Sequence, residues 1–339
     1  MEQIPPGNGK KILGGRVVMD NEVTGRVRDF ETEKLEKEEE KALGAYPETA
    51  QVLINWTHAI DWQVVTDLFI EYAVRSGVSL ERFNAPERIY FLSELKGIMD
   101  YRALTNSVQV NVAEFDAQFR AKGGGSSKDW IRFIRTIFHE WTHGTGVVSI
   151  GLDRHVIDKV DCVSTYWRYG FEQGAAANWV MRSDGGPDSH TRSLFRLLNE
   201  GITEQISHEV LWEYVQRYPN VNRGAVADTL VEDIARDADN YDAARYLVMA
   251  LADAMARYAG ISTEIVWRGF VREYFSGELS LREIRDLFSD LFGNDFSERV
   301  AAADSAQELR KLASSLPHIT RTDLVEKWLE HLDESHGAK

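Results

Sequence analysis

His139, Glu140 and His143 form the pattern His-Glu-x-x-His within the segment 128–146, KDWIRFIRTIFHEWTHGTG. Side chains four residues apart on a helix lie one above the other on the same face, so both imidazoles can reach one ion. Zinc binds histidine nitrogens at ~2.0–2.1 Å, and the helix fixes the separation of the two rings. The glutamate beside the first histidine can then act as general base on a zinc-bound water. The spacing predicts a catalytic zinc site.

A helix over 128–146 is expected to position these side chains. Its apolar residues recur at the intervals of one helical face: Trp130, Phe133, Ile134, Ile137, Phe138 and Trp141. At about 100° per residue, both histidines lie nearly opposite that face, with Glu140 on its flank. Ser126 or Ser127 follows a glycine triplet and can cap a helix that begins near Asp129. One side of the helix should therefore face the core, and the other should present the ligands.

A catalytic zinc ion also needs a third protein ligand and an open position for water. The metzincin spacing would place a histidine at position 149, where this chain has Ser149. The segment 194–210, LFRLLNEGITEQISHEV, carries Glu200 and Glu204 four residues apart and opposite an apolar helical stripe. We expect Glu200 to complete the site, and Glu204 to accept a hydrogen bond from one of the two histidines.

Two alternatives to this ligand assignment stay open. A pair of glutamates on one helix face is also common on solvent-exposed surfaces. His155, with Asp153 nearby, could supply the third ligand instead of Glu200.

The segments IRTIFHEWTH and LNEGITEQIS together resemble the gluzincin zinc metallopeptidases, of which thermolysin is the best-known type. The resemblance implies that His139, His143 and Glu200 bind zinc. It also implies that Glu140 is the general base and that Glu204 takes the place of the acid that orients a ligand. The similar residues cover under a tenth of the chain, and the gap between the two segments is far longer than in thermolysin.

The same resemblance supplies two further expectations. Asn199 matches the asparagine that precedes the glutamate ligand in the family. A tyrosine or histidine is expected to stabilise the oxyanion, and we place this role on Tyr241, because a helix N-terminus commonly borders a cleft. Tyr246, Arg245 and His208 are the alternatives.

The expected fold class is α+β and predominantly helical, as a zincin-like catalytic domain with two lobes. Residues 1–45 are expected to form a polar N-terminal arm, whose charge run, 31–41, is either a solvated segment or part of a propeptide or delivery segment. Residues 46–188 should form the N-terminal lobe with a small sheet and the active-site helix. Residues 189–339 should form a helical C-terminal lobe that carries the third ligand.

Within the N-terminal lobe, the apolar spacing over 49–77 indicates a helix, and Arg88–Leu92 is typical of a buried strand. Residues Ser107–Ala113 alternate between apolar and polar side chains, which predicts a half-buried strand at a sheet edge. By family analogy, a peptide substrate would pair with this edge. The segment 147–188 is expected to be a long connection with short helical pieces.

Composition excludes several classes of protein. The 339 residues include 39 Lys and Arg against 54 Asp and Glu, a net charge of −15, which argues against nucleic acid as a partner. No apolar stretch has the length of a membrane span. The first residues lack the features of a secretory signal peptide, and the single cysteine, Cys162, is consistent with a reducing compartment. We expect a cytoplasmic protein, or one delivered to a host cell without such a signal.

The sequence therefore predicts a zinc-dependent peptidase with one Zn²⁺ per chain that acts on a protein or peptide substrate. One alternative is a zincin-like regulatory or interaction protein that binds zinc without peptidase activity. Another is a helical protein in which the histidine pattern is fortuitous and no metal is bound. The identity of the substrate, the choice between endo- and exopeptidase action and the oligomeric state stay open.

Overall fold

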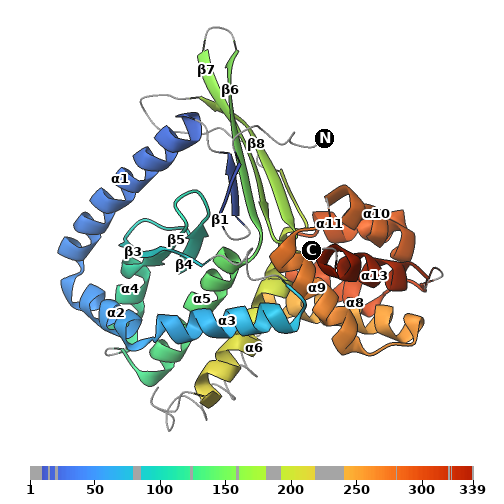
Figure 1. The fold of residues 1–339 in the computed structure, drawn as a ribbon. Helices are drawn as coiled ribbons and strands as arrows, with labels where there is room; N and C mark the ends of the chain where they lie inside the picture. Colours follow the sequence, from blue (N-terminus) through green and yellow to red (C-terminus); the bar gives the residue numbers. More distant parts are fainter. Residues whose placement is uncertain are drawn as a thin grey trace.

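The computed structural model of the chain is shown as a ribbon in Figure 1. It describes residues 10–13, 16–19, 22–78, 85–122, 125–157, 160–180, 192–217, 240–279, 281–319, 321 and 323–337. These residues form an α+β fold in which helices predominate, which confirms that part of the predicted fold class.

Groups of strands and groups of helices follow one another along the chain, and every described element after β9 is a helix. The helices are α1 (Glu22–Ala45), α2 (Pro47–Ala59), α3 (Trp62–Arg75), α4 (Val112–Lys122), α5 (Ser127–Thr145), α6 (Arg196–Arg217), α8 (Asn240–Ala259), α9 (Thr263–Ser276), α10 (Leu281–Phe292), α11 (Asn294–Ala302), α12 (Ala306–Ser314) and α13 (Asp323–Gly337). The strands are β1 (Lys10–Leu13), β2 (Arg16–Met19), β3 (Arg88–Leu92), β4 (Met99–Arg102), β5 (Ser107–Asn111), β6 (Val148–Ile157), β7 (Val160–Tyr169), β8 (Glu172–Val180) and β9 (Arg192–Leu194).

The larger sheet has six strands in the order β1-β2-β6-β7-β8-β9, antiparallel except for the parallel pair β2 and β6. Strands β6 to β8 project above the helices in Figure 1. The expectation of a long connection with short helical pieces over 147–188 is therefore wrong. Glycine and alanine fill much of β8, so pairing with the neighbouring strands, more than intrinsic propensity, accounts for this part of the sheet.

The smaller sheet has the order β3-β5-β4, with β5 parallel to β3 and antiparallel to β4. The expectation that Ser107–Ala113 forms an edge strand is wrong, because β5 is the central strand and α4 begins at Val112. Gln109 and Asn111 are buried although they alternate with valines. The Asn111 side chain satisfies its amide by donating to the carbonyls of Leu95 and Gly97.

Residues 1–9, part of the predicted N-terminal arm, lie outside the described residues, but the described part of 10–45 contacts the rest of the fold. Strand β2 pairs with β6, and α1 packs against β3. Leu35 of α1 is buried with Tyr90 and Leu92, and Glu39 accepts a hydrogen bond from the backbone N–H of Phe91. Most other side chains in the charge run of α1 are at least partly exposed, as expected for a solvated face.

The predicted helix over 49–77 is two helices. Asp61 caps α3 by accepting a hydrogen bond from the N–H of Val64, which starts a new helix after Ile60.

Both ligand-bearing helices of the prediction are present as α5 and α6. Ser126 and Asp129 form a reciprocal capping box at the start of α5, so this helix begins where its sequence indicates.

Helices α5 and α6 pack against each other near the middle of the molecule, and α5 also packs against β4 (Figure 1). Buried apolar side chains from Ala50 to Trp328 form one continuous cluster that spans both halves of the chain. Within the described residues, no helix combines the length and apolar character needed to cross a bilayer.

Candidate metal centre

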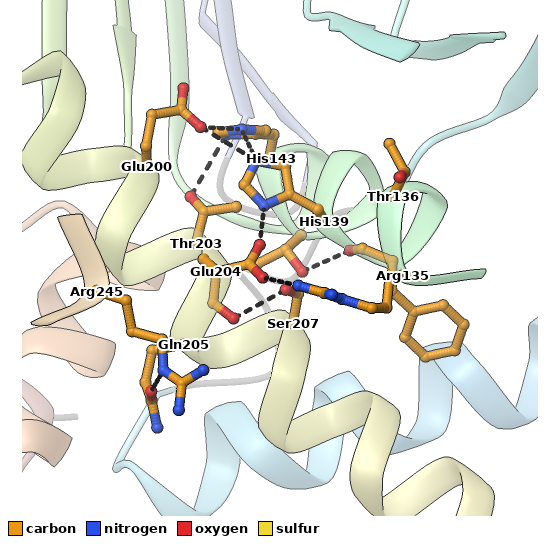
Figure 2. Close-up of polar contacts among 12 residues, drawn as sticks. Arg135, Thr136, His139, His143, Glu200, Thr203, Glu204, Gln205, Ser207 and Arg245 are labelled. Carbon is orange, nitrogen blue, oxygen red and sulfur yellow. Dashed lines mark hydrogen bonds and ion pairs between the residues drawn. The ribbon is translucent and has the colours of Figure 1, made fainter. Parts of the chain in front are cut away.

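Three side chains from α5 and α6 converge on one point, as Figure 2 shows. Glu200 Oε2 lies 3.1 Å from His139 Nε2 and 3.4 Å from His143 Nε2. The two Nε2 atoms are 3.1 Å apart. The three side chains are only 5–13 % exposed, and among the described residues they are the one group with the composition and spacing of a metal site.

This triangle has the dimensions of one face of a tetrahedral zinc site. Ligand atoms about 2.0–2.1 Å from a tetrahedral ion lie roughly 3.3–3.4 Å from one another. The observed separations of 3.1, 3.1 and 3.4 Å fit this requirement without rearrangement of either helix. The donor set, two imidazoles and one carboxylate, also suits zinc and leaves a fourth position for water.

His139 is oriented by a charged partner. Its Nδ1 donates to Glu204 Oε2 over 2.8 Å, and Glu204 Oε1 accepts from Arg135 Nη2 over 3.3 Å (Figure 2). With the proton on Nδ1, a neutral His139 ring turns the lone pair of Nε2 toward Glu200 and His143. Glu204 therefore has the predicted role, and its partner is His139 and not His143.

His143 lies next to buried hydroxyl groups. Its Nδ1 lies 3.5 Å from Thr203 Oγ1, which in turn lies 3.0 Å from the hydroxyl of Tyr274. The Tyr274 hydroxyl donates to the backbone carbonyl of Thr142 over 3.0 Å. Thr203 and Tyr274 are fully buried, so this support contains no solvent-exposed group.

The site favours positive charge between its carboxylates. Burial alone lowers the pKa of His139, but hydrogen bonds to Glu200 and Glu204 outweigh it and raise that pKa well above its ordinary value. Burial also lowers the pKa of His143, and the charge of Glu200 turns this into a net rise. Burial raises the pKa of Glu200, yet His143 and His139 hold it far below its usual range. For Glu204, burial is outweighed by His139 and Arg135, which lower its pKa to about 2.

Protons and a metal ion compete for the same histidine nitrogens. A site that holds its carboxylates ionised around two imidazoles is therefore also one that attracts a divalent cation. This electrostatic character agrees with the geometry of the triangle.

Glu140 is buried beside the two histidines on α5, with 8 % of the residue exposed. Burial raises its pKa; His139 and His143 oppose the rise, while Asp100 and Glu200 add to it. The charges that act on Glu140 thus include all three members of the triangle.

The described hydrogen bond of the Asn199 side chain goes to the backbone and not to the triangle, although Asn199 precedes Glu200. Its Oδ1 accepts from the backbone N–H of Phe171, at the turn between β7 and β8. Asn199 thus joins the larger sheet to α6 one residue before the glutamate. Among the described residues, no hydrogen bond supports a second role for Asn199 as a partner of a metal ligand.

The structure gives no support to the alternative oxyanion donors and does not describe the side chain of the favoured one. Tyr241 lies in the first turn of α8, and its side chain falls outside the described part of the chain. Tyr246 is 61 % exposed, and Arg245 donates to Gln205 over 2.7 Å. His208 lies eight residues beyond Glu200 on α6, about 12 Å along the helix axis, which is too far to reach an oxyanion bound at the triangle.

His155 and Asp153, the alternative ligands, belong to β6, and their side chains lie outside the described part of the chain. The side chain of Cys162 in β7 does so as well.

Three residues of the hydrogen-bond networks around the candidate ligands were not found from the sequence. Arg135 lies four residues before His139, and Thr203 lies three residues after Glu200, so helical spacing places each on a ligand-bearing face. The helical spacing could therefore have identified both Arg135 and Thr203. Tyr274 comes from α9, 71 residues after Thr203, and no local pattern connects the two.

Comparison of the chain with family models, with curated proteins and with solved structures finds no match. The resemblance of the two short segments to the gluzincins therefore stays an expectation, and the case for a function depends on the residues of the site.

Proposed function

We propose that this chain is a zinc-dependent peptidase of the gluzincin type. The observation that carries the proposal is the triangle of His139 Nε2, His143 Nε2 and Glu200 Oε2, with separations of 3.1–3.4 Å. Its ligand set belongs to catalytic zinc sites, because structural zinc sites are usually closed by four protein ligands, most often cysteines and histidines. The order of these residues along the chain, with Glu140 after the first histidine, also supports a hydrolytic role.

Each side chain has a defined task in this proposal. His139, His143 and Glu200 hold the ion, which when bound supplies a water acidic enough to lose its proton near neutral pH. The Glu140 carboxylate accepts that proton as the peptide carbonyl is attacked, and it then gives the proton to the leaving amine. Glu204 and Arg135 keep His139 in the tautomer and orientation that this task requires.

The proposal includes a zincin-like division into two lobes, with the substrate bound beside α5. Support comes from β4, which packs against α5 and, in the described part of the chain, pairs only with β5. Met99 and Tyr101 of β4 are buried in the core, whereas Asp100 and Arg102 point to the other face, where they form an ion pair of 2.9 Å. We place an extended peptide along β4, in place of the strand 107–113 expected from the sequence.

The test is cleavage of a mixture of unstructured peptides, followed by mass spectrometry, with three preparations. The wild-type protein loaded with zinc should cleave peptides, and a chelator should abolish cleavage until zinc is restored. Glu140→Gln should keep its zinc but lose activity by a factor of ~10²–10⁴, the usual contribution of general acid–base catalysis.

Peptide cleavage by Glu140→Gln at the wild-type rate would contradict the assigned role of the base. Stoichiometric zinc in a wild-type protein that cleaves no peptide and no protein would favour the regulatory alternative.

A further inference from the structure

The hydrogen-bond chain behind His143 has a direction that the chemistry of its members determines. A carbonyl oxygen only accepts, so the Tyr274 hydroxyl must donate to Thr142 O, at 3.0 Å. Tyr274 then has no proton left for Thr203 and accepts from its hydroxyl, at 3.0 Å. Thr203 in turn has used its one proton, so toward His143 Nδ1, at 3.5 Å, it can only accept.

This direction defines the tautomer of His143. Nδ1 carries the proton, and Nε2 of the neutral ring presents its lone pair to Glu200 and His139, 3.4 and 3.1 Å away. A metal ligand must be a neutral imidazole with a free lone pair. The hydroxyl chain thus achieves for His143, without charge, what the Glu204 carboxylate achieves for His139.

We infer that Thr203 and Tyr274 are positioning residues for the metal site, which hold His143 in its metal-binding tautomer and orientation. This role rests on the proposed zinc site, because without a metal the tautomer of His143 has no function to serve.

The surroundings of Tyr274 show how its ring comes to lie between α5 and α6. A Cβ atom at Gly146 would lie 2.6 Å from Tyr274 Cε1, and one at Gly170 would lie 2.6 Å from Tyr274 Cδ2. The backbone carbonyl of Tyr274 accepts from the N–H of Val147, at 2.9 Å. The end of α5 and the β7–β8 turn therefore leave space for this ring, and a larger residue at either glycine would displace it.

The experiment measures zinc affinity by competition with a chromophoric chelator. Thr203→Val removes the hydroxyl but keeps the shape, and we expect affinity to fall by roughly 10-fold, within the range for partners that orient metal ligands. Thr203→Ser keeps the hydroxyl and should restore affinity to within about 2-fold of wild type. Tyr274→Phe keeps Thr203 but frees its proton, and a loss of ~3-fold is expected.

A matched control separates positioning from general destabilisation. Thr57 of α2 is also buried and donates to a carbonyl of its own helix, Leu53 O at 2.9 Å. Thr57→Val should lower the melting temperature of the zinc-free protein without a change in zinc affinity. The double variant Thr203→Val/Tyr274→Phe should bind zinc no more weakly than Thr203→Val alone, because both substitutions interrupt one chain.

The outcomes distinguish this inference from the proposed function. If the wild-type protein binds no zinc, the metal site itself is excluded. If the wild type binds zinc and Thr203→Val binds it equally tightly, the positioning role alone is excluded. If Thr203→Val does not fold, wild-type affinity in Tyr274→Phe would overturn the inference.

Discussion

His139 and His143 lie one turn apart on α5 and face the same glutamate, yet the groups behind them differ in charge. Behind His139 stands an ionised carboxylate, Glu204, at 2.8 Å, itself paired with Arg135. Behind His143 stand two buried hydroxyls, the nearer of them at 3.5 Å. One helix thus presents two ligands of the same type with supports of different strength.

The difference in charge between the two supports indicates how strongly each histidine should be held as a metal ligand. A carboxylate partner orients an imidazole and also increases its basicity, whereas a neutral hydroxyl mainly orients it. A charge-assisted hydrogen bond is also about twice as strong as a neutral one. We therefore expect His139 to be the more strongly held ligand and His143 the one whose contribution is more easily lost.

Removal of both supports at once should have the largest effect. The hydrogen bonds described for the two supports come from different side chains, Arg135 and Glu204 on one side and Thr203 and Tyr274 on the other, so we expect their contributions to multiply. With ~100-fold expected for Glu204→Ala and ~10-fold for Thr203→Val, the double variant should lose about 10³-fold in zinc affinity, measured by chelator competition. A combined loss equal to that of Glu204→Ala alone would show that the two supports act as one.

Removal of the charged support alone should have the next largest effect. Glu204→Ala is expected to lower zinc affinity by ~100-fold, the upper end of the range for such partners. Glu204→Gln, which keeps an acceptor oxygen without the charge, should resemble the hydroxyl-supported side and lose about 10-fold. Equal affinities for Glu204→Gln and the wild type would contradict the importance of charge in this comparison.

A substitution that fills the space around Tyr274 should have a smaller effect than the loss of either support, and this effect is on stability. Gly146 has φ −66° and ψ 170°, which alanine tolerates, so Gly146→Ala acts only through its clash with the Tyr274 ring. Forced overpacking of this kind should reduce the free energy of unfolding by about 1–3 kcal/mol. Thermal unfolding of the zinc-free protein measures this reduction.

The matched control is Gly44→Ala in α1, where an added Cβ meets nothing within 4 Å and alanine should leave stability equal or higher. If Gly146→Ala and Gly44→Ala both stabilise the protein, the close packing of Gly146 against the Tyr274 ring would be contradicted.

A third histidine on the same pair of helices, His208, shows the opposite pKa shift. Burial, with the positive charge of Arg245, lowers the pKa of His208 to about 4, below the ~6.5 of an unfolded chain. Below pH 6.5 the unfolded chain therefore binds more protons than the folded one, so the free energy of unfolding falls as pH drops from 6.5 to 4.

We expect this effect to remove about 1 kcal/mol between pH 7 and pH 5, after allowance for the partial exposure of His208. His208→Gln should flatten the pH dependence by that amount in thermal unfolding of the zinc-free protein. Parallel curves for the two proteins would show that His208 titrates normally.

The ligand helices could be predicted because the information is local. The apolar stripe of α5, its cap at Ser126 and the spacing of His139 and His143 all lie within about 20 residues. The same holds for Glu200 and Glu204 on α6. That the two helices would meet could be inferred only from the chemical need for a third ligand, and the triangle at 3.1–3.4 Å agrees with it.

The features that could not be predicted depend on distant partners. Strand β8 is rich in alanine and glycine, and it is a strand because β7 and β9 pair with it. The central position of β5 depends on β3 and β4, and the alternation of its side chains gave the wrong exposure because Asn111 is satisfied inside the core. Tyr274 reaches the site from a separate helix, so only the folded chain shows its contact with Thr203.

The most direct test of the metal centre is the zinc content per chain, measured by plasma mass spectrometry for the wild type and Glu200→Ala in parallel. We expect close to one zinc ion per wild-type chain and far less in the variant, since the variant keeps both histidines but loses the third ligand. Equal zinc in the two proteins would place the third ligand elsewhere. No zinc in either protein, even after supplementation, would contradict the metal centre and the peptidase that we propose.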